Sequence, residues 1–444
     1  MPQEEYRRKR TTADEEAARI RSGDTVYLAC GCLLPVDFAA ALYRAAPRLR
    51  NVKVLNYLPL EPLALLSDPD CGEAFDVCSI FYNKFQQSAQ ALGRCSFLPT
   101  HLRNAARDLG CAAESYDCMV LTVSPMDRHG YFSLAGSAGI ELAMLPRARR
   151  LVVEVASHAP RIFGDTMLHI SQVDAVLESD RYPCVLPSEI PDEADRQLGQ
   201  VVAGLVEDGD TIQLGFGGTI NALASELKGK RHLGIHTEAL SDAGMELLRS
   251  GAADNSRKTL HPGRTVTCFT MGSQALYDFI DDNPAFLHKT LSYTNNPSVL
   301  AAHPGMTSIN AALQIDLTGQ CASEGLGTRH ISGSGGQVDT SVGAQMAPGG
   351  KSIITLRSTY QSRDPNTGET RIQSRILPVL PQGAAVTLTR TNTHFVATEY
   401  GAVCLRGLTI PQRARALIRI AHPDFRPWLE DAFERQYHQR LPRS

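Results

Sequence analysis

The chain contains the same short unit twice, and this repeat constrains its fold more than any other feature. Residues 13–31 and residues 194–217 both begin with Ala-Asp, continue with a helical pattern and reach the triplet Gly-Asp-Thr. In each copy an alternating apolar strand and a glycine turn follow the triplet, and then come an Ala/Leu-rich helix and a second short strand. Helices that alternate with single strands are typical of parallel sheets. The sequence therefore predicts an α/β protein with two related open domains and mainly parallel sheets.

A polar segment with spaced prolines, residues 186–193, lies just before the second copy of the unit. Such a composition is typical of a linker. We therefore predict an N-terminal α/β domain over residues 1–190 and a C-terminal α/β domain over residues 191–444. A chain of 444 residues is long enough for two or three domains.

Further elements are expected in the second domain. Apolar patterns predict single strands over 307–317 and 351–356, and a helix over 429–437. The stretch 325–350 is rich in glycine and cannot supply much core, so we expect it to bring backbone close to a ligand.

Composition excludes several classes of protein. The net charge of −3 creates no basic field that would attract nucleic acid or anionic lipid. The eleven cysteines form no C-x-x-C pair and no Cys/His spacing typical of a metal site. The N-terminus has no pattern of a signal peptide, and no apolar run approaches the ~20 residues that cross a bilayer. We expect a reduced cytoplasmic protein without a metal, and no binding to nucleic acid or membranes.

A glycine turn at 215–218, Gly-Phe-Gly-Gly, follows an apolar strand and precedes a helix. A dinucleotide-binding fold has G-x-G-x-x-G at this place and an acidic residue about 20 residues further on. The third glycine position is Ile220, and the acidic residue Glu238 is followed by Ser241-Asp242 instead of closing a simple strand. An NAD-dependent oxidoreductase therefore remains an open alternative, although the pattern is incomplete.

The same residues also fit a different chemistry. Ligands of open α/β sheets bind at the carboxyl ends of the strands, where Glu238 is expected. A carboxylate can act as a nucleophile, and glycine N–H groups can stabilise an oxyanion. A solvated surface carboxylate is the ordinary explanation for one such glutamate. His236 lies two residues earlier, on the same face of the strand, where it either tunes Glu238 or only packs beneath it.

Several ordered segments together resemble the acetyl-CoA hydrolase/transferase family, the class I CoA-transferases. The closest branch is 4-hydroxybutyrate CoA-transferase, and the first half matches less well, mainly at 123–131 and 164–165. The segments that carry the resemblance are 234–238 (GIHTE), 293–297 (YTNNP), 309–320 (INAALQIDLTGQ), 332–339 (SGSGGQVD), 349–354 (GGKSII) and 398–401 (TEYG).

The resemblance implies a homodimeric enzyme that moves CoA between an acyl-CoA and a small carboxylic acid such as acetate, butyrate or 4-hydroxybutyrate. It implies ping-pong kinetics through a glutamyl-CoA thioester, with coenzyme A as a cosubstrate and no tightly bound cofactor. An acyl-CoA hydrolase on the same scaffold stays open, because only the exclusion of water separates the two activities. The implied site consists of the nucleophile Glu238, of Asn295 beside the reacting carbonyl, and of oxyanion- or CoA-binding backbone at Phe216, Gly217, Gly335 and Gly336.

Other residues have weaker assignments. Lys351 is a candidate for contact with the phosphates of CoA, since a cation should lie near a pyrophosphate. Glu399 is expected to be structural or to shape the substrate pocket rather than to act as a nucleophile. Cys30 lies at the first-domain turn that mirrors Phe216, and we expect a buried small residue there rather than a reactive thiol. In the family the position of Phe216 is usually aliphatic and an aromatic residue commonly follows Asp339, and both departures concern acyl specificity.

Overall fold

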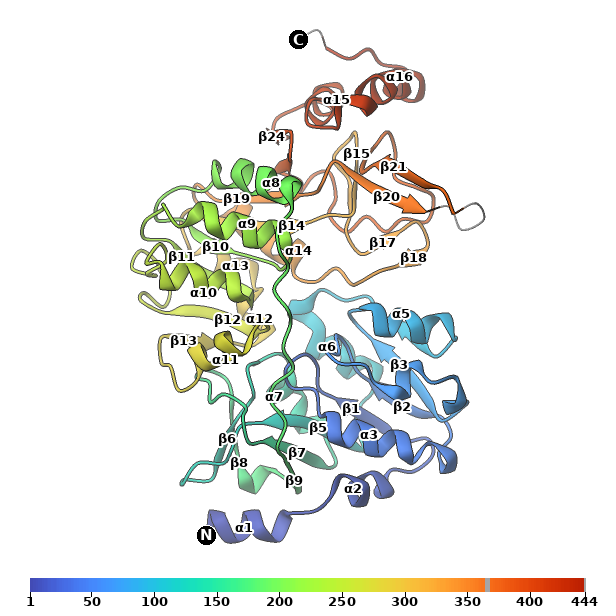
Figure 1. Cartoon of the computed structure of the whole chain (residues 1–444), viewed down its shortest axis with the longest axis vertical. Coiled ribbons are helices and arrows are strands. Elements are labelled where there is room, and N and C mark those ends of the chain that lie inside the picture. Colours follow the sequence, from blue (N-terminus) through green and yellow to red (C-terminus); the bar gives the residue numbers. More distant parts are fainter. Residues whose placement is uncertain (364–367, 443–444) are drawn as a thin grey trace. The chain divides into compact units, whose positions relative to one another are not determined.

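The computed structural model describes residues 1–363 and 368–442 (Figure 1). Contacts divide the chain into two compact units. The predicted domain division at residue 190 stays a prediction, because clusters of contacts do not show which part folds on its own. The first unit consists of Met1–Pro187, Thr237–Asp242 and Arg264–Thr294, and the second of Ser188–His236, Ala243–Gly263 and Asn295–Ser444.

The first unit contains a seven-stranded sheet in the order β4-β3-β2-β1-β5-β7-β9. All its strand pairs are parallel, and the strand order reverses between β1 and β5. Such a reversal creates a crevice for ligands at the carboxyl ends of the strands. The strands are β1 (Thr25–Leu28), β2 (Val52–Leu55), β3 (Phe75–Ser79), β4 (Cys95–Phe97), β5 (Cys118–Val123), β7 (Leu151–Ala156) and β9 (Ala175–Ser179).

Both faces of this sheet are covered, as expected for a parallel sheet. Tyr27 packs into the hydrophobic cluster on one face, whereas its neighbours Val26 and Leu28 pack into the cluster on the other. A small antiparallel pair, β6 (Tyr131–Ser133) and β8 (Met167–His169), lies outside the sheet. The helices of this part are α1 (Pro2–Lys9), α2 (Ala13–Arg19), α3 (Val36–Arg44), α4 (Ala64–Ser67), α5 (Lys84–Ala91), α6 (Ala105–Ala112) and α7 (Glu141–Met144).

A second large sheet has the order β13-β12-β11-β10-β14-β19-β23-β24. Its strand order repeats that of the first sheet, with an antiparallel strand added at the end. The predicted repeat and the predicted fold class are confirmed. The strands are β10 (Thr211–Gln213), β11 (Gly234–Leu240), β12 (Thr265–Thr270), β13 (Phe286–His288), β14 (Met306–Ala311), β19 (Lys351–Thr355), β23 (Phe395–Thr398) and β24 (Gly401–Cys404).

The two Gly-Asp-Thr triplets form the same turn before β1 and β10. Gly23 and Gly209 both adopt positive φ, +83° and +88°, which glycine reaches without a steric cost. The next residue closes the turn in each copy. Asp24 accepts a hydrogen bond from the Arg21 N–H at 2.7 Å, and Asp210 accepts one from the N–H of the residue three positions earlier at 2.9 Å. The triplet therefore recurs because one turn geometry recurs.

The helix before each triplet begins with a capping box. In α2 the Thr12 hydroxyl accepts from the Glu15 N–H at 3.2 Å, and the Glu15 carboxylate accepts from the Thr12 N–H at 3.0 Å. In α8 (Glu193–Ala203), Asp192 and Asp195 make the same exchange at 3.0 and 3.3 Å. Each exchange satisfies two N–H groups at a helix start. In the second copy, α8 packs along α9 (Gly218–Leu227), as Figure 1 shows.

One predicted strand was wrong in extent. The apolar run 307–317 is not a single strand, because the chain leaves the large sheet at Ala312 and β15 (Gln314–Asp316) pairs with β16 (Cys321–Ala322) and β22 (Ile376–Leu377) instead. The strand predicted over 351–356 is β19, and the helix predicted over 429–437 begins earlier, as α16 (Arg426–Tyr437). The glycine-rich stretch contains the hairpin β17 (Gly325–Leu326) and β18 (Arg329–His330) and the helix α14 (Gln337–Met346).

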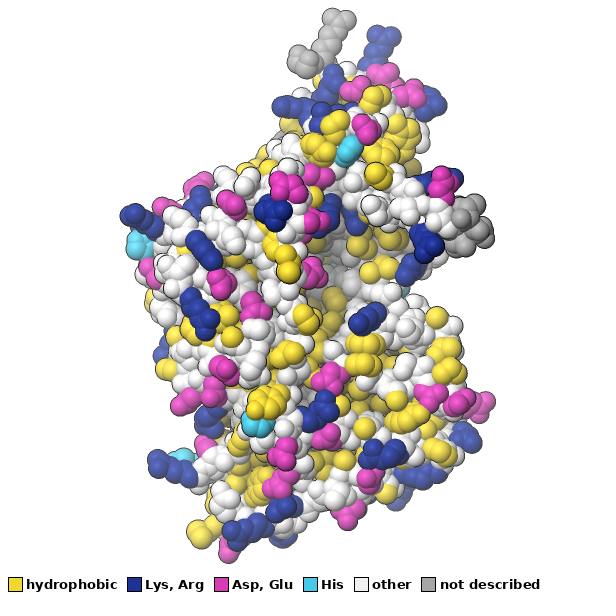
Figure 2. All heavy atoms as spheres, viewed as in Figure 1, with side chains coloured by type: hydrophobic (Ala, Val, Ile, Leu, Met, Phe, Trp, Pro, Cys, Tyr) yellow, Lys and Arg dark blue, Asp and Glu magenta, His cyan; other side chains and the backbone are white. Residues whose placement is uncertain are grey.

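The remaining elements include the hairpin β20–β21, which Figure 1 shows beside β15. On the face drawn in Figure 2, Lys and Arg side chains are interspersed with Asp and Glu side chains. Within the described ranges, no helix is long and apolar enough to cross a membrane. The remaining elements are β20 (Thr359–Arg363), β21 (Thr370–Ser374), α10 (Asp242–Arg249), α11 (Gln274–Ile280), α12 (Leu291–Thr294), α13 (Pro297–Ala301) and α15 (Ile410–Arg419).

Candidate active site

Glu238 lies in the last half of β11 and is the one half-buried residue of that strand, whose other residues are buried. Its backbone carbonyl accepts a hydrogen bond from the Thr267 hydroxyl of β12 at 3.3 Å. The thiol of Cys268 lies close enough to respond to the Glu238 charge. Burial raises the pKa of that thiol well above its usual value, and the nearby Glu238 carboxylate raises it further. Glu238 therefore lies on a buried strand and is itself only partly buried.

His236 and Glu238 alternate with buried Thr237, so both side chains lie on the same face of β11. The ring of His236 is buried, and its centroid lies 5.2 Å from that of His303. Burial lowers the pKa of His303 to about 4, with the nearby Lys258 and His261 as further causes. His236 therefore packs against a second buried histidine.

The predicted glycine turn lies between β10 and α9. Gly217 has φ +106°, and a Cβ on Gly218 would lie 2.4 Å from a carboxylate oxygen of Asp195. Only glycine suits both positions without a rearrangement. The turn lines a pocket of about 330 Å³ that is formed entirely by residues of the second unit. Phe216 is half-buried in its wall.

The second glycine segment precedes α14, where Gly335 has φ +56° and Gly336 is the N-cap residue. The first turn of α14 is tied to the sheet through Thr340. Its hydroxyl accepts hydrogen bonds from Ser308 at 3.0 Å and from the side-chain amide of Asn310 at 3.0 Å. Thr340, which departs from the family pattern, therefore has a specific polar role in this chain.

Asn295 is completely buried at the junction between α12 and α13. The next residue, Asn296, caps α13 by accepting from the Ser298 N–H at 2.9 Å. Asn296 thus caps the start of α13, and Asn295 before it is buried inside the protein.

Lys351 is not brought together with the glycine turn. It is the first residue of β19, and its ammonium lies 3.2 Å from Asp210 and 3.3 Å from Glu207. In a parallel sheet the amino ends of the strands lie opposite the edge that binds ligands. The structure therefore gives Lys351 carboxylate partners at the amino end of β19, and its contact with CoA phosphates stays a prediction.

The cations at the carboxyl end are Arg357 and Arg375, and the sequence analysis did not identify them. Both line the 330 Å³ pocket together with the glycine turn. The sequence could have indicated Arg357, because this residue follows the carboxyl end of the predicted strand 351–356, whereas Lys351 lies at the amino end of that strand. No comparable signal exists for Arg375, which follows a hairpin.

Glu399 contacts the chain segment that follows β19, and its role as a structural or substrate-shaping residue stays a prediction. Its carboxylate accepts hydrogen bonds from the backbone N–H of Ser358 at 2.9 Å and from the Ser358 hydroxyl. These contacts hold the chain where it leaves β19, next to Arg357.

Cys30 is buried, in line with the expectation of a small core residue. Burial raises the pKa of its thiol well above the usual value, and the buried carboxylate of Glu141 raises it further. The thiolate is the reactive form of cysteine, so Cys30 is a poor nucleophile near neutral pH.

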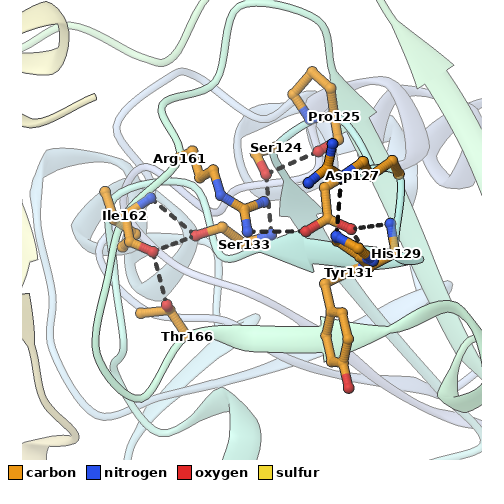
Figure 3. A network of polar contacts seen from close by, with 10 residues as sticks. Ser124, Pro125, Asp127, His129, Tyr131, Ser133, Arg161, Ile162 and Thr166 are labelled. Atoms are coloured by element: carbon orange, nitrogen blue, oxygen red, sulfur yellow. Dashed lines mark hydrogen bonds and ion pairs between the residues drawn. The ribbon is translucent and has the colours of Figure 1, made fainter. Parts of the chain in front are cut away.

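The first-half motif at 123–131 forms a polar network in the first unit (Figure 3). Asp127 accepts from the Tyr131 N–H at 2.9 Å and pairs with Arg161 at 3.0 Å. The Ser133 hydroxyl donates to the Ile162 carbonyl at 2.9 Å and accepts from the Ile162 N–H at 3.0 Å. The contact between Asp127 and Tyr131 closes the loop after β5, and the contacts with Arg161 and Ile162 tie this loop and β6 to residues 161–162. In the part of the chain that the structure describes, no group of His, Cys, Asp and Glu side chains could hold a metal ion.

A duplicated parallel sheet with glycine turns at the carboxyl ends of its strands, and a half-buried carboxylate on a central strand, defines a CoA-transferase-like α/β protein. The chain belongs to the acetyl-CoA hydrolase/transferase family. The N-terminal domain of that family matches residues 1–187, and its C-terminal domain matches residues 272–433. The resemblance found in the sequence is thereby confirmed.

Similar proteins cover nearly the whole chain. A 4-hydroxybutyrate coenzyme A transferase of Clostridium kluyveri is 34% identical over 98% of this chain and 99% of its own. A succinyl-CoA:cyclohexane-1-carboxylate CoA transferase of Geobacter metallireducens is 36% identical over 98% of this chain and 97% of its own. Among solved structures, RipA from Yersinia pestis has a TM-score of 0.88 and 33% identity, and covers 98% of this chain and 99% of its own. A 4-hydroxybutyrate CoA-transferase from Porphyromonas gingivalis has a TM-score of 0.82 and 32% identity, and covers 98% of this chain and 100% of its own.

Proposed function

We propose that this chain is an acyl-CoA:carboxylate CoA-transferase in which Glu238 is the nucleophile. The observation that carries the proposal is the half-buried carboxylate on a strand that is otherwise buried. The family, and the CoA-transferase activity named for relatives with 33–37% identity, support it.

The proposed reaction begins with attack of a Glu238 carboxylate oxygen on the thioester carbonyl of an acyl-CoA. The carbon–sulfur bond breaks, CoA leaves as a thiolate, and a glutamyl–acyl anhydride remains. The thiolate then attacks the glutamyl carbonyl and releases the first acid, which leaves Glu238 as a CoA thioester. The incoming carboxylate attacks this thioester, and the same two steps in reverse order yield the new acyl-CoA and free Glu238. In every step one thiolate or carboxylate attacks and another leaves. Charge and electrons therefore balance, and no redox partner is needed.

The glycine segments have a role in this scheme. Each addition to a carbonyl creates an oxyanion, and preorganised N–H donors stabilise such a charge by about 2.7–4 kcal/mol each in comparable sites. Phe216, Gly217, Gly335 and Gly336 remain the proposed donors, and Asn295 remains the proposed side-chain donor. The turn between β10 and α9 lies at the carboxyl end of its strand, which agrees with this role.

A covalent trap tests the proposal. The protein is incubated with acyl-CoA and then with borohydride, which reduces a glutamyl thioester to an alcohol. Mass spectrometry of peptides should locate the modification on Glu238, and Glu238→Ala should abolish it. Modification of Glu399 or Cys30 in its place would contradict the assignment.

Acyl-CoA hydrolysis is the second candidate, because two yeast relatives named acetyl-CoA hydrolase match at 26% identity over 282 residues and 23% identity over 400 residues. Hydrolysis differs from transfer only in that water attacks the intermediate. The release of CoA from acetyl-CoA is measured with and without an added carboxylic acid. Turnover that does not depend on the acid would assign the chain to the hydrolases. The glycine turn at 215–218 also left open an NAD-dependent oxidoreductase, and this function has no support from these relatives.

A cytoplasmic location and a homodimer are further parts of the proposal. The location rests on the cysteine usage and composition of the sequence, and the homodimer rests on the family resemblance. Light scattering coupled to size-exclusion chromatography gives the mass in solution. A mass near twice 48.3 kDa would agree with the dimer.

A further inference from the structure

The pocket beside the glycine turn has a mixed lining of two arginines, two carboxylates (Glu189 and Asp195) and several apolar side chains. It has a volume of about 330 Å³ and lies at the carboxyl ends of β10, β14 and β19. Its wall includes Phe216, Gly217, Leu313, Thr355, Arg357 and Arg375.

The charge of Arg357 is already used within the protein. Its guanidinium lies 2.8 Å from the carboxylate of Asp192 and 2.7 Å from that of Asp195. Asp195 also accepts a hydrogen bond from the Thr219 hydroxyl at 2.6 Å. Arg357 therefore ties the starts of α8 and α9 together and adds little net charge to the pocket.

The charge of Arg375 is not neutralised by a contact of this kind. Among the residues that the structure describes, no carboxylate lies within 4 Å of its guanidinium. The side chain donates to the carbonyls of Leu313 at 2.9 Å and Thr359 at 3.4 Å, and it lies over the ring of Tyr360, 5.0 Å from the centroid. A guanidinium has five N–H donors, so these contacts leave donors for a ligand.

The backbone of Arg375 is fixed on both sides. Its N–H donates to the carbonyl of Ser358 at 2.8 Å, and its carbonyl accepts from the N–H of Ile315 at 3.0 Å. Glu399 holds Ser358 in turn, at 2.9 Å from the Ser358 N–H. The cation is thus presented by a rigid frame, which reduces the entropy lost when it binds an anion.

The glycine turn that lines the same pocket already binds a carboxylate oxygen. The carboxylate of Glu189, from the segment between the two copies of the repeat, accepts from the Gly218 N–H at 3.0 Å and lies beside Gly217. Glu189 is exposed, so a stronger anion can compete with it for this place. The pocket therefore has two anion-accepting features, Arg375 and the glycine turn.

We infer that this pocket binds a phosphate group of the CoA nucleotide and that Arg375 is its principal ligand. The inference rests on the proposed CoA-transferase function. A phosphate suits the site better than the carboxylate of the substrate acid, because the carboxylate loses its charge when it forms an anhydride. The phosphates of CoA keep their charges through every step, so a fixed cation can bind them in all states of the reaction. Contacts to such remote, unreactive groups are a common source of binding energy for catalysis.

Truncated thioesters test the inference. The ratio kcat/KM is measured for acyl-CoA, acyl-3′-dephospho-CoA, acyl-phosphopantetheine and acyl-pantetheine with the wild-type protein and with Arg375→Gln. Loss of a charge-assisted hydrogen bond should lower kcat/KM by about ten- to a hundredfold for thioesters that carry the contacted phosphate. The two proteins should act equally well on acyl-pantetheine. The thioester at which the difference disappears identifies the phosphate.

Arg371→Gln is the matched control, since Arg371 lies on the same hairpin, is exposed and pairs with Glu369. It should leave all four values unchanged. An equal loss on all four thioesters with Arg375→Gln would overturn the inference, and so would a rise in the KM of the acid alone. Should Arg375→Gln not fold, Arg375→Lys is measured in its place and should show a smaller loss with the same dependence on phosphate.

Binding of CoA without turnover separates this inference from the proposed function. Calorimetry should show that Arg375→Gln binds CoA at least tenfold more weakly than wild type and that Arg371→Gln binds it equally well. A wild-type protein that binds CoA through Arg375 but transfers no acyl group would retain the site and refute the transferase. Equal affinity of wild type and Arg375→Gln for CoA would refute the site.

Discussion

The carboxylate of Glu399 accepts hydrogen bonds from both the backbone N–H and the hydroxyl of Ser358, the former at 2.9 Å. Glu399 is thus occupied in holding the chain after β19. Glu399→Ala should lower the free energy of unfolding by about 1–2 kcal/mol, because a partly buried N–H loses a charged acceptor. Denaturant titration measures this, with exposed Glu369→Ala as the control. The borohydride-trapped modification should persist in Glu399→Ala, and its loss would contradict a structural role.

Removal of the proposed nucleophile should abolish activity and leave the fold intact. Glu238→Ala should lower kcat by roughly 10⁴-fold or more, since loss of a nucleophile removes the covalent route. Stability should change little, because Glu238 is only partly buried and belongs to no hydrophobic core cluster. Initial rates and melting curves are compared with those of Glu246→Gln, an exposed carboxylate on the next helix. A kcat within tenfold of wild type would contradict the assignment.

Glu154 should make the protein more stable in acid than in base. Its carboxyl group is 2% exposed, and burial raises its pKa from 4.5 to about 7 although it accepts from the N–H groups of Asp37 and Phe38. The folded state therefore holds a proton that the unfolded state has lost between pH 4.5 and 7. The stabilisation is fully present below pH 4.5 and is lost as the pH rises through 7.

Replacement of Glu154 tests whether its contribution to stability falls as the pH rises. Glu154→Gln should raise the free energy of unfolding at pH 8 by about 3 kcal/mol, at 1.36 kcal/mol for each pKa unit, and should have little effect at pH 4.5. Urea titrations at the two pH values measure the difference, and exposed Glu114→Gln should show no dependence on pH. An equal effect of Glu154→Gln at both values would refute the prediction.

Cys30 should resist alkylation in the folded protein. Its buried thiol has a raised pKa, whereas Cys111 and Cys404 are exposed. Treatment with iodoacetamide at pH 8, followed by mass spectrometry of peptides, should show fast labelling of the two exposed residues and little labelling of Cys30. Labelling of Cys30 as fast as that of Cys111 would indicate a reactive thiol at the first turn.

The two turn glycines offer a matched pair of substitutions. Gly23→Ala places a Cβ in open space, so its cost of about 1–2 kcal/mol comes from the left-handed backbone alone. Gly209→Ala has the same strain and also places a Cβ 2.9 Å from the Cδ of Arg257, so it should cost more. Melting temperatures measure both. Gly229→Ala, with open space and no positive φ, should be neutral, and equal values for all three would show that the turn geometry does not matter.

The α/β fold could be predicted because the repeated turn depends on local chemistry. Gly-Asp-Thr specifies a positive φ, a carboxylate acceptor and the start of a strand, and all three are visible in the letters. The end of β14 could not be predicted, because Ala312 and Leu313 are as apolar as the strand before them. Only the pairing of Leu313 with Ala322 shows that the chain has moved to another sheet.

The site was predictable where it depends on one segment and not where distant segments meet. Glu238 and the turn at 215–218 each follow from their own strand. Arg375 reaches the pocket because β22 pairs with β15, a contact between residues about 60 positions apart that no local pattern encodes. Lys351 shows that a cation near a strand is not enough to predict a contact with a ligand. Ligands of such sheets bind at the carboxyl ends of the strands, and Lys351 lies at the amino end of β19.

Because of the repeat, residues in one half of the chain have equivalent positions in the other half. Thr25 pairs with Lys53 across the first sheet, and the equivalent Thr211 pairs with Gly234 across the second. Tyr57 lies as many residues after Lys53 as Glu238 lies after Gly234, so the two residues occupy equivalent positions in the repeat. Burial raises the pKa of the Tyr57 phenol well above its usual value, which leaves it unreactive. If the two halves descend from one ancestral unit, only one descendant carries the proposed nucleophile, so the proposed mechanism places a single acyl group on each chain at a time.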